Sequence, residues 1–146
     1  MSMRWIHESP PAWDAKKAEI FGAAGPGVFD PALTDRSEGQ LLPGDWWRVE
    51  EEGETVGYAC MDVIWGDAEM LLAVAPEYRR KGVGTFILDR LEQEARNQGL
   101  NYLYNEVRPS HPQHEEVSEW LRARNFVEYD DGRLLRSVVR PVRAAG

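Results

Sequence analysis

Residues 69–99 place the tightest limits on the fold, because they predict a strand, a turn and a helix in immediate succession. A short apolar run, residues 70–74, is typical of a buried strand and is broken by Pro76. Beyond the turn, apolar side chains recur every four residues and indicate one buried face of a helix: Val83, Ile87, Leu91 and Ala95.

The turn between them reads Arg79-Arg80-Lys81-Gly82-Val83-Gly84. Gly82 and Gly84 let the backbone approach a ligand closely, because no Cβ stands in the way. The first amides of the new helix have no internal acceptor and point outward, where they can bind an anion. Three cationic side chains just before them suit a diphosphate better than a single carboxylate.

Two common nucleotide-binding motifs do not fit this turn. It lacks the Lys-Ser/Thr ending of a Walker P-loop, and it has one glycine too few for the dinucleotide fingerprint. The stretch does resemble motif A of the GNAT superfamily of acyl-CoA-dependent N-acyltransferases, written Arg/Gln-x-x-Gly-x-Gly/Ala. Arg79, Gly82 and Gly84 fill that motif, and Pro76 and Tyr78 stand where the family usually has them.

The resemblance implies an α/β (α+β) GNAT fold, with a mixed central sheet of about six to seven strands flanked by helices and splayed between the fourth and fifth strands. Residues 1–146 would form a single N-acetyltransferase domain with an ordered core of about residues 3–140. Acetyl-CoA would be the acyl-donor cosubstrate, its diphosphate on the turn and its pantetheine arm paired with the strand edge. The expected cofactor-binding residues are Leu72, Ala73, Val74, Arg79, Arg80, Lys81, Gly82, Val83, Gly84 and Thr85.

Composition is consistent with a soluble cytoplasmic chain. The 146 residues suffice for one core, and 42% are hydrophobic and 29% charged. No apolar run approaches the roughly 18 residues of a membrane helix, and the N-terminus has no apolar signal core. Cys60 is the only cysteine, and its apolar surroundings favour packing over nucleophilic chemistry.

Charge is distributed unevenly along the chain. Residues 1–75 hold 14 acidic against 5 basic side chains, a net −9, and residues 76–146 hold 11 against 12, a net +1. Such an acidic first half disfavours nucleic acid as a partner. If that half shapes the acceptor pocket, a cationic amine of a small molecule or peptide is a better acceptor than an acid, although acidic residues can equally be a solvated surface. The oligomeric state is not readable, so a homodimer stays open.

The remaining elements follow from periodicity and from turn residues. Residues 25–45 are irregular, and in the resembled family this region covers the acceptor; Phe29, Asp30, Asp35 and Glu38 are candidates for acceptor contacts. The six tryptophans are more simply read as packing than as an aromatic pocket for an amine. The expected strands and helices are residues 3–7, 12–24, 46–50, 54–65, 68–74, 100–107, a helix capped by Ser110, and a hairpin of 126–129 with 133–140.

Glu106 is the expected catalytic base. Alternation along its strand turns it toward the cofactor gap, and it matches a family glutamate within a Glu-Val-Arg run, here residues 106–108. A solvent-facing polar residue is the simpler alternative. Glu69 is a rival base, but it lies three residues before Leu72 and should face away unless a β-bulge shifts the strand. By resemblance, the amide of Val74 holds the thioester oxygen.

The chain departs from its relatives at the proton donor. Many members carry a tyrosine in the middle of the last helix, where this chain has Trp120 or Leu121. Tyr104, Ser118 or water remain as donors, and His111 is more simply structural. The three histidines show no metal-ligand spacing with Cys60, so we expect no metal.

Two classes of function therefore stay open. The first is an acyltransferase, an N-acetyltransferase that moves an acetyl group from acetyl-CoA to a primary amine. The second is a catalytically silent acyl-CoA-binding sensor or regulatory module of the same fold, an alternative that the missing tyrosine motivates. The identity of the amine and the acyl chain length are not readable from the sequence.

Overall fold

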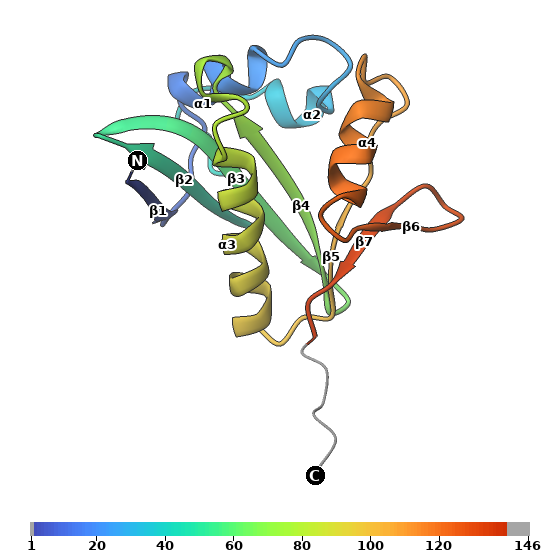
Figure 1. Ribbon diagram of the computed structural model, residues 1–146. Helices are drawn as coiled ribbons and strands as arrows, with labels where there is room; N and C mark the ends of the chain where they lie inside the picture. The colour runs from blue at the N-terminus through green and yellow to red at the C-terminus, as the bar shows by residue number, and fades with distance from the viewer. Residues whose placement is uncertain (1, 140–146) are drawn as a thin grey trace.

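The structure is a computed structural model that describes residues 2–139. Within them the chain forms a seven-stranded sheet in the order β1-β2-β3-β4-β5-β7-β6 (Figure 1). The strands are β1 (Met3–Glu8), β2 (Asp45–Glu51), β3 (Glu54–Ile64), β4 (Asp67–Val74), β5 (Tyr102–Asn105), β6 (Val127–Glu128) and β7 (Leu134–Ser137). The helices are α1 (Ala15–Gly22), α2 (Pro31–Thr34), α3 (Val83–Asn97) and α4 (His114–Arg122), with a 3-10 turn η1 (Pro76–Tyr78).

Tight hairpins connect β2, β3 and β4. Glu52-Gly53 and Trp65-Gly66 have φ values of 50°, 82°, 51° and 80°, so both central residues of each turn are left-handed. That sign pattern belongs to type I′ turns, whose twist matches that of the flanking strands. β1 to β4 accordingly pair antiparallel in chain order.

The sheet opens between β4 and β5. These strands run parallel and pair only where residues 67–69 meet residues 102–104, whereas β4 continues to Val74. At the point of divergence the Asn105 side-chain amide donates to the Met70 carbonyl at 2.8 Å. The seven strands and this splay confirm the fold that the sequence predicted.

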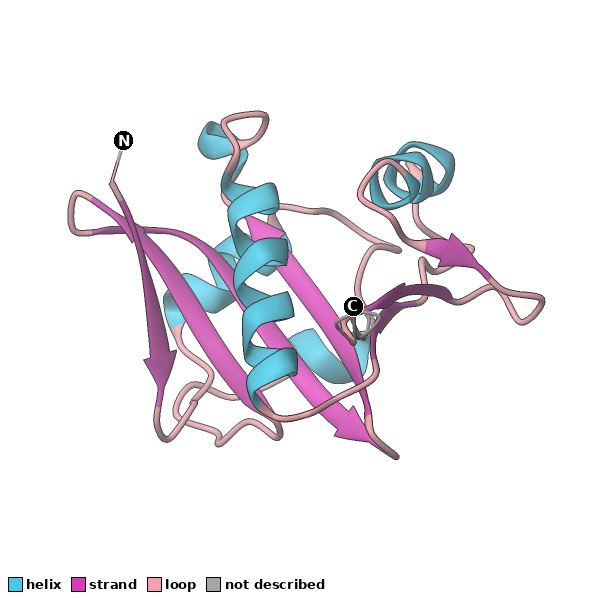
Figure 2. Cartoon of the chain, turned by 60° about the horizontal axis from the view of Figure 1, so that its bottom comes forward, coloured by secondary structure: helices cyan, strands magenta, loops and turns pink. Residues whose placement is uncertain are grey.

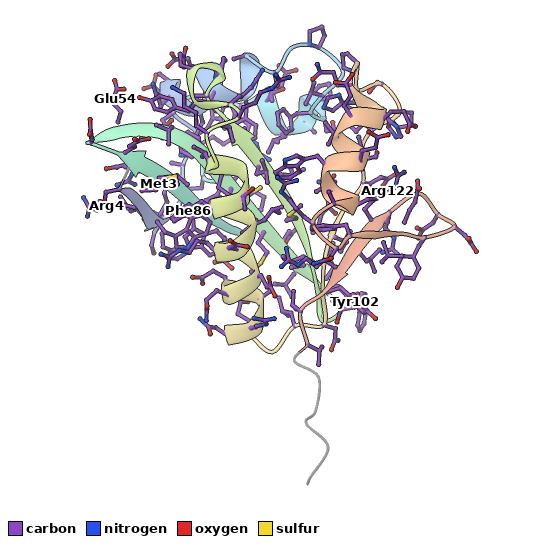
Figure 3. The ribbon with its side chains drawn as sticks, viewed as in Figure 1. Met3, Arg4, Glu54, Phe86, Tyr102 and Arg122 are labelled. Atoms are coloured by element: carbon purple, nitrogen blue, oxygen red, sulfur yellow. The ribbon has the colours of Figure 1, made fainter. Side chains whose placement is uncertain are left out.

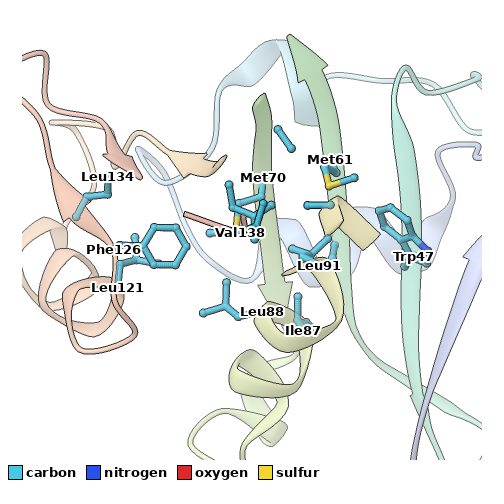
Figure 4. Packing of buried hydrophobic residues seen from close by; sticks show 14 of the residues in the cluster. Trp47, Met61, Met70, Ile87, Leu88, Leu91, Leu121, Phe126, Leu134 and Val138 are labelled. Carbon is cyan, nitrogen blue, oxygen red and sulfur yellow. The ribbon is translucent and has the colours of Figure 1, made fainter. Parts of the chain in front are cut away.

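The helices cover the two faces of the sheet. α3 crosses one face, and α1 and α2 lie on the other (Figure 2). α3 buries the four predicted residues and Leu88 against β3, β4 and β5. Figure 4 shows this core continuing past Met70 to Leu121 and Phe126, so one apolar cluster joins both sides of the splay.

The first helix is shorter than predicted, and a second helix follows it where none was predicted. The first begins at Ala15 because the Asp14 carboxylate accepts a hydrogen bond from the Lys17 amide and caps it. A short helix, α2, lies in the stretch expected to be irregular. There Asp30 is the N-cap and Pro31 occupies the first turn, a pairing that marks helix starts.

The last helix begins later than predicted. Ser110 does not cap it, because its hydroxyl donates to the Gly27 carbonyl at 2.8 Å, and α4 starts at His114. The closing hairpin is also shorter than expected, with β7 ending at Ser137. The predicted end of that strand, Arg140, lies outside the described residues.

A buried lysine anchors α1 to the sheet. Lys17 is 1% exposed, and its ammonium lies 2.7 Å from a Glu8 carboxylate oxygen and 3.1 Å from Asp14. It also donates to the Ala12 carbonyl at 2.8 Å and lies 4.8 Å from the Tyr58 ring centroid. Removing it would leave the Glu8 carboxylate, which is 11% exposed, with only the Arg48 guanidinium at 3.4 Å as a counter-charge.

We therefore expect Lys17→Ala to lower the free energy of unfolding by about 3 kcal/mol. The matched control is Lys16→Ala, one residue earlier, whose partner Glu19 is largely exposed. That control should cost less than about 1 kcal/mol. Urea denaturation followed by tryptophan fluorescence measures both, and equal losses in the two variants would contradict the anchoring role.

Candidate active site

A cavity of about 830 Å³ occupies the splay between β4 and β5. Its wall takes residues from both faces of the sheet, because the missing strand pairing leaves an opening through the sheet. On the α3 and α4 side lie residues such as Gly84 and Trp120, and on the α1 and α2 side lie Ile20 and Phe29. A ligand can therefore enter from one face and meet a second molecule at the other.

The turn before α3 forms the cationic end of the cavity. Gly82 is the helix N-cap with φ of 85°, and the Phe86 amide is the donor to its carbonyl. The preceding amides, of residues 83–85, therefore have no carbonyl of the helix as partner. Arg79 and Arg80 line the same end, and Arg80 is itself left-handed with φ of 62°. Amides and cations together favour a bound anion here.

Most of the predicted cofactor residues line the cavity. The eight that do are Leu72, Ala73, Val74, Arg79, Arg80, Gly82, Gly84 and Thr85. Lys81 is not among them, and its ammonium lies 5.5 Å from the Tyr78 ring centroid. Val83 is 1% exposed and packs in the core under α3, so only its backbone amide can serve a ligand.

Away from the cationic turn, the cavity wall carries carboxylates. Those that line it belong to Asp30, Glu69, Glu106 and Glu116, and Phe29 lines it beside Asp30. Two other predicted acceptor residues, Asp35 and Glu38, do not. Negative charge at this end would attract a cationic acceptor.

Two hydrogen bonds join residues 27–29 to residues 108–110 beside this part of the cavity. An Arg108 guanidinium nitrogen donates to the Phe29 carbonyl at 2.8 Å, and Ser110 bonds Gly27 as described. The approach is tight, since a Cβ on Gly27 would lie 2.3 Å from the Ser110 carbonyl oxygen. The loop after α1 is thereby tied to the loop before α4.

Glu69 lies on the cavity wall despite its position in the strand. The register of β3 with β4 runs without a bulge, so Glu69 does face opposite to Leu72. The cavity extends to that face, however, and Glu69 lines it, so the expectation that its side chain points away from the cavity is wrong. The Tyr104 hydroxyl lies 3.2 Å from its carboxylate.

The predicted proton donors do not reach the cavity. Neither Tyr104 nor Ser118 lines it, and Ser118 is 1% exposed. Burial and then the charge of Glu69 raise the pKa of Tyr104, so its hydroxyl keeps its proton. Among the six tryptophans, all within the described residues, Trp120 alone lines this cavity. Trp13, Trp46 and Trp47 are buried and Trp5 packs against the core, as predicted, but Trp65 is 97% exposed, so the packing prediction is wrong for that residue.

His111 does line the cavity. Its Nδ1 accepts a hydrogen bond from the Gln113 amide at 2.9 Å, which requires Nδ1 to be unprotonated. The neutral ring then carries its proton on Nε2. Burial, and after it the charge of His114, lower the pKa of His111, so the ring is mainly neutral at pH 7.

Two side chains on the cavity wall escaped the sequence reasoning as ligands, one from α4 and one from the turn that follows it. Trp120 lies against Gly84, where a Cβ would be 3.0 Å from the indole. The Arg124 guanidinium lies 4.0 Å from the Trp120 ring centroid and donates to the Thr85 hydroxyl at 3.2 Å. A signal was present, because Trp120 and Arg124 are four residues apart at the end of a predicted helix, a spacing that brings two side chains together.

The fold and the site can be compared with those of known proteins. Residues 8–117 match the model of the acetyltransferase (GNAT) family. The chain belongs to this family. The match confirms the resemblance carried by Arg79, Gly82 and Gly84, and it places this GNAT chain in a family of acyltransferases.

Two curated relatives illustrate the sequence similarity. The GNAT chain is 39% identical over 82 residues to the amino-acid acetyltransferase of Pseudomonas putida (strain GB-1), which is 53% of this chain and 17% of that protein. It is 31% identical over 65 residues to the ribosomal protein bS18-alanine N-acetyltransferase of Escherichia coli (strain K12), which is 44% of each. The chain thus spans less than half the length of these relatives.

Solved GNAT structures share the fold. The crystal structure of the ribosomal-protein-S18-alanine N-acetyltransferase from Escherichia coli superposes with a TM-score of 0.60 and 17% identity, over 98% of this chain and 99% of that one. N-acetylglutamate synthase from Neisseria gonorrhoeae, complexed with coenzyme A and N-acetyl-glutamate, gives 0.68 and 16%, over 94% and 36%. At such identities the likeness shows the fold alone.

Within residues 2–139, no group of three or more His, Cys, Asp or Glu side chains could hold a metal ion. Over the same residues, every helix is too short or too polar to cross a membrane.

The lowered pKa of His111 is directly testable. Its ring should titrate with a midpoint below 6.5 in an NMR pH series, with His111→Gln used to assign the resonance. Because the unfolded ring takes up a proton more readily, this residue's contribution to stability is present above 6.5 and is lost as pH falls through the lowered pKa. A midpoint at or above 6.5 would contradict this environment.

Proposed function

We propose that this GNAT chain transfers an acetyl group from acetyl-CoA to a primary amine. The observation that carries the proposal is the unpaired edge of β4, which opens into a cavity running from the cationic turn to Glu106. In the proposal the turn of residues 79–85 binds the diphosphate, and the backbone of residues 72–74 pairs with the pantetheine arm as an added strand.

The acceptor we propose is a cationic amine, on a small molecule or on a peptide or protein. Asp30, Glu69 and Glu106 give the far end of the cavity three carboxylates within reach of an ammonium group. The names of the two curated relatives, one acting on an amino acid and the other on an alanine of a ribosomal protein, are consistent with an amine acceptor.

Glu106 serves as the base in this mechanism. It removes a proton from the ammonium group, directly or through a water, and the freed nitrogen bonds to the thioester carbonyl carbon. The amide of Val74 hydrogen-bonds the carbonyl oxygen as charge develops on it. The carbon–sulfur bond then breaks, the nitrogen releases its second proton to water, and the thiolate takes a proton from water, since Tyr104 and Ser118 do not line the cavity.

The sensor remains the second candidate, and a specific observation favours it. Trp120 fills the part of α4 where many relatives have a tyrosine acid, and an indole cannot donate a proton in this way. A sensor would bind coenzyme A and release no thiol with any amine.

We expect Glu106→Gln to lower turnover by about 100-fold while leaving coenzyme A binding unchanged. Free thiol released from acetyl-CoA measures turnover against a panel of polyamines, amino acids, aminoglycosides and peptide N-termini. Glu69→Gln is the matched control, because it removes a carboxylate from the same end of the cavity. A loss confined to Glu69→Gln would transfer the role of base to Glu69, and tight binding without turnover in the unmodified chain would favour the sensor.

A further inference from the structure

Helix α4 contacts the start of α3 across the cavity. The Trp120 ring lies so close to Gly84 that a Cβ there would come within 3.0 Å of Cζ2 and 3.3 Å of Cη2. Since Gly84 has an ordinary helical backbone, its lack of a side chain serves this close approach. The indole therefore forms a flat wall next to the cationic turn.

Arg124 lies on that wall with a fixed orientation. Its guanidinium stacks 4.0 Å from the Trp120 ring centroid, its Nε donates to the Thr85 hydroxyl at 3.2 Å, and Nη1 donates to the Trp120 carbonyl at 3.0 Å. Within residues 2–139 no carboxylate lies at ion-pair distance from it. Its neighbour Arg122, in contrast, pairs with Glu128 at 2.9 Å.

Arg124 and Thr85 both retain donors that their mutual contact does not use. Two of the five guanidinium N–H groups are used in the contacts above, which leaves three. Thr85 accepts from Arg124, so its own hydroxyl hydrogen is free to donate. Both residues line the cavity together with Arg79 and Arg80.

We propose that Arg124, held on Trp120, is a diphosphate-binding residue that the C-terminal end of α4 and the turn after it contribute to the cofactor site. The inference rests on the proposed function and deepens it, because it adds a cation from outside the Arg79–Gly84 motif. A planar guanidinium matches two phosphate oxygens better than a point charge does. Trp120 thus supports Arg124 in this proposal. That role differs from the acid role of the tyrosine that many relatives carry at this place.

The test is calorimetric titration of coenzyme A and of dephospho-coenzyme A, which lacks the 3′-phosphate. Arg124→Gln should weaken binding of both by about tenfold or more, because each loses the same charge-assisted hydrogen bonds. Arg122→Gln is the control two residues earlier, at the end of α4, since Arg122 points toward the β6 hairpin and away from α3 (Figure 3). It should bind both ligands as the unmodified chain does.

The outcomes separate this inference from the proposed function. No binding of coenzyme A by the unmodified chain would overturn the proposed function itself. Normal binding by Arg124→Gln, within twofold, would overturn only the role of α4, and a loss seen with coenzyme A alone would move Arg124 from the diphosphate to the 3′-phosphate. Trp120→Leu, which keeps the cation and removes the ring that supports it, should weaken both ligands by a smaller factor, and thermal unfolding verifies that each variant is folded.

Discussion

The unpaired edge of β4 is the feature on which the rest of the structure depends. Backbone N–H and C=O groups need partners, and an edge left open inside a sheet offers a row of them to a ligand. Only the first of these groups is satisfied internally, where Asn105 donates to the Met70 carbonyl. Because backbone groups face alternate sides along a strand, Leu72 and Val74 then have their N–H and C=O groups available on the β5 side, where the pantetheine arm is proposed to pair.

The apex of the splay, where β4 and β5 still pair, must be held together so that the two sides of the sheet do not separate further. At the C-terminal end of α3, Glu92 binds Arg96 at 2.6 Å and also bonds Arg136 of β7. Arg96 in turn donates to the Val138 carbonyl at 3.0 Å. These partly buried, charge-assisted bonds tie α3 to the β5–β7 side, while its apolar face packs on β3 and β4. One helix therefore belongs to both sides of the opening.

Sequence reasoning succeeded where the structure is determined locally. The period of Val83, Ile87 and Leu91 and the glycine turn before them fix α3 and the cationic end, and both were predicted with their residues. It failed where distant loops meet. Ser110 has the pattern of a helix cap, but its hydroxyl donates a hydrogen bond to the Gly27 carbonyl instead. The sequence predicted which face of β4 Glu69 occupies. It could not show that this face lines the cavity, because that depends on where α1 and α2 pack.

The other end of the opening is held differently from the apex. There α3 and α4 meet through the Trp120 ring on Gly84 and through the bond from Arg124 to Thr85, contacts that lie on the cavity wall. A diphosphate bound at this end, as proposed, would meet the Arg124 N–H groups and the Thr85 hydroxyl that these contacts leave free. The ion pairs of Glu92 join α3 to β7 rather than to α4, so they hold the opening without taking part in the proposed ligand contacts.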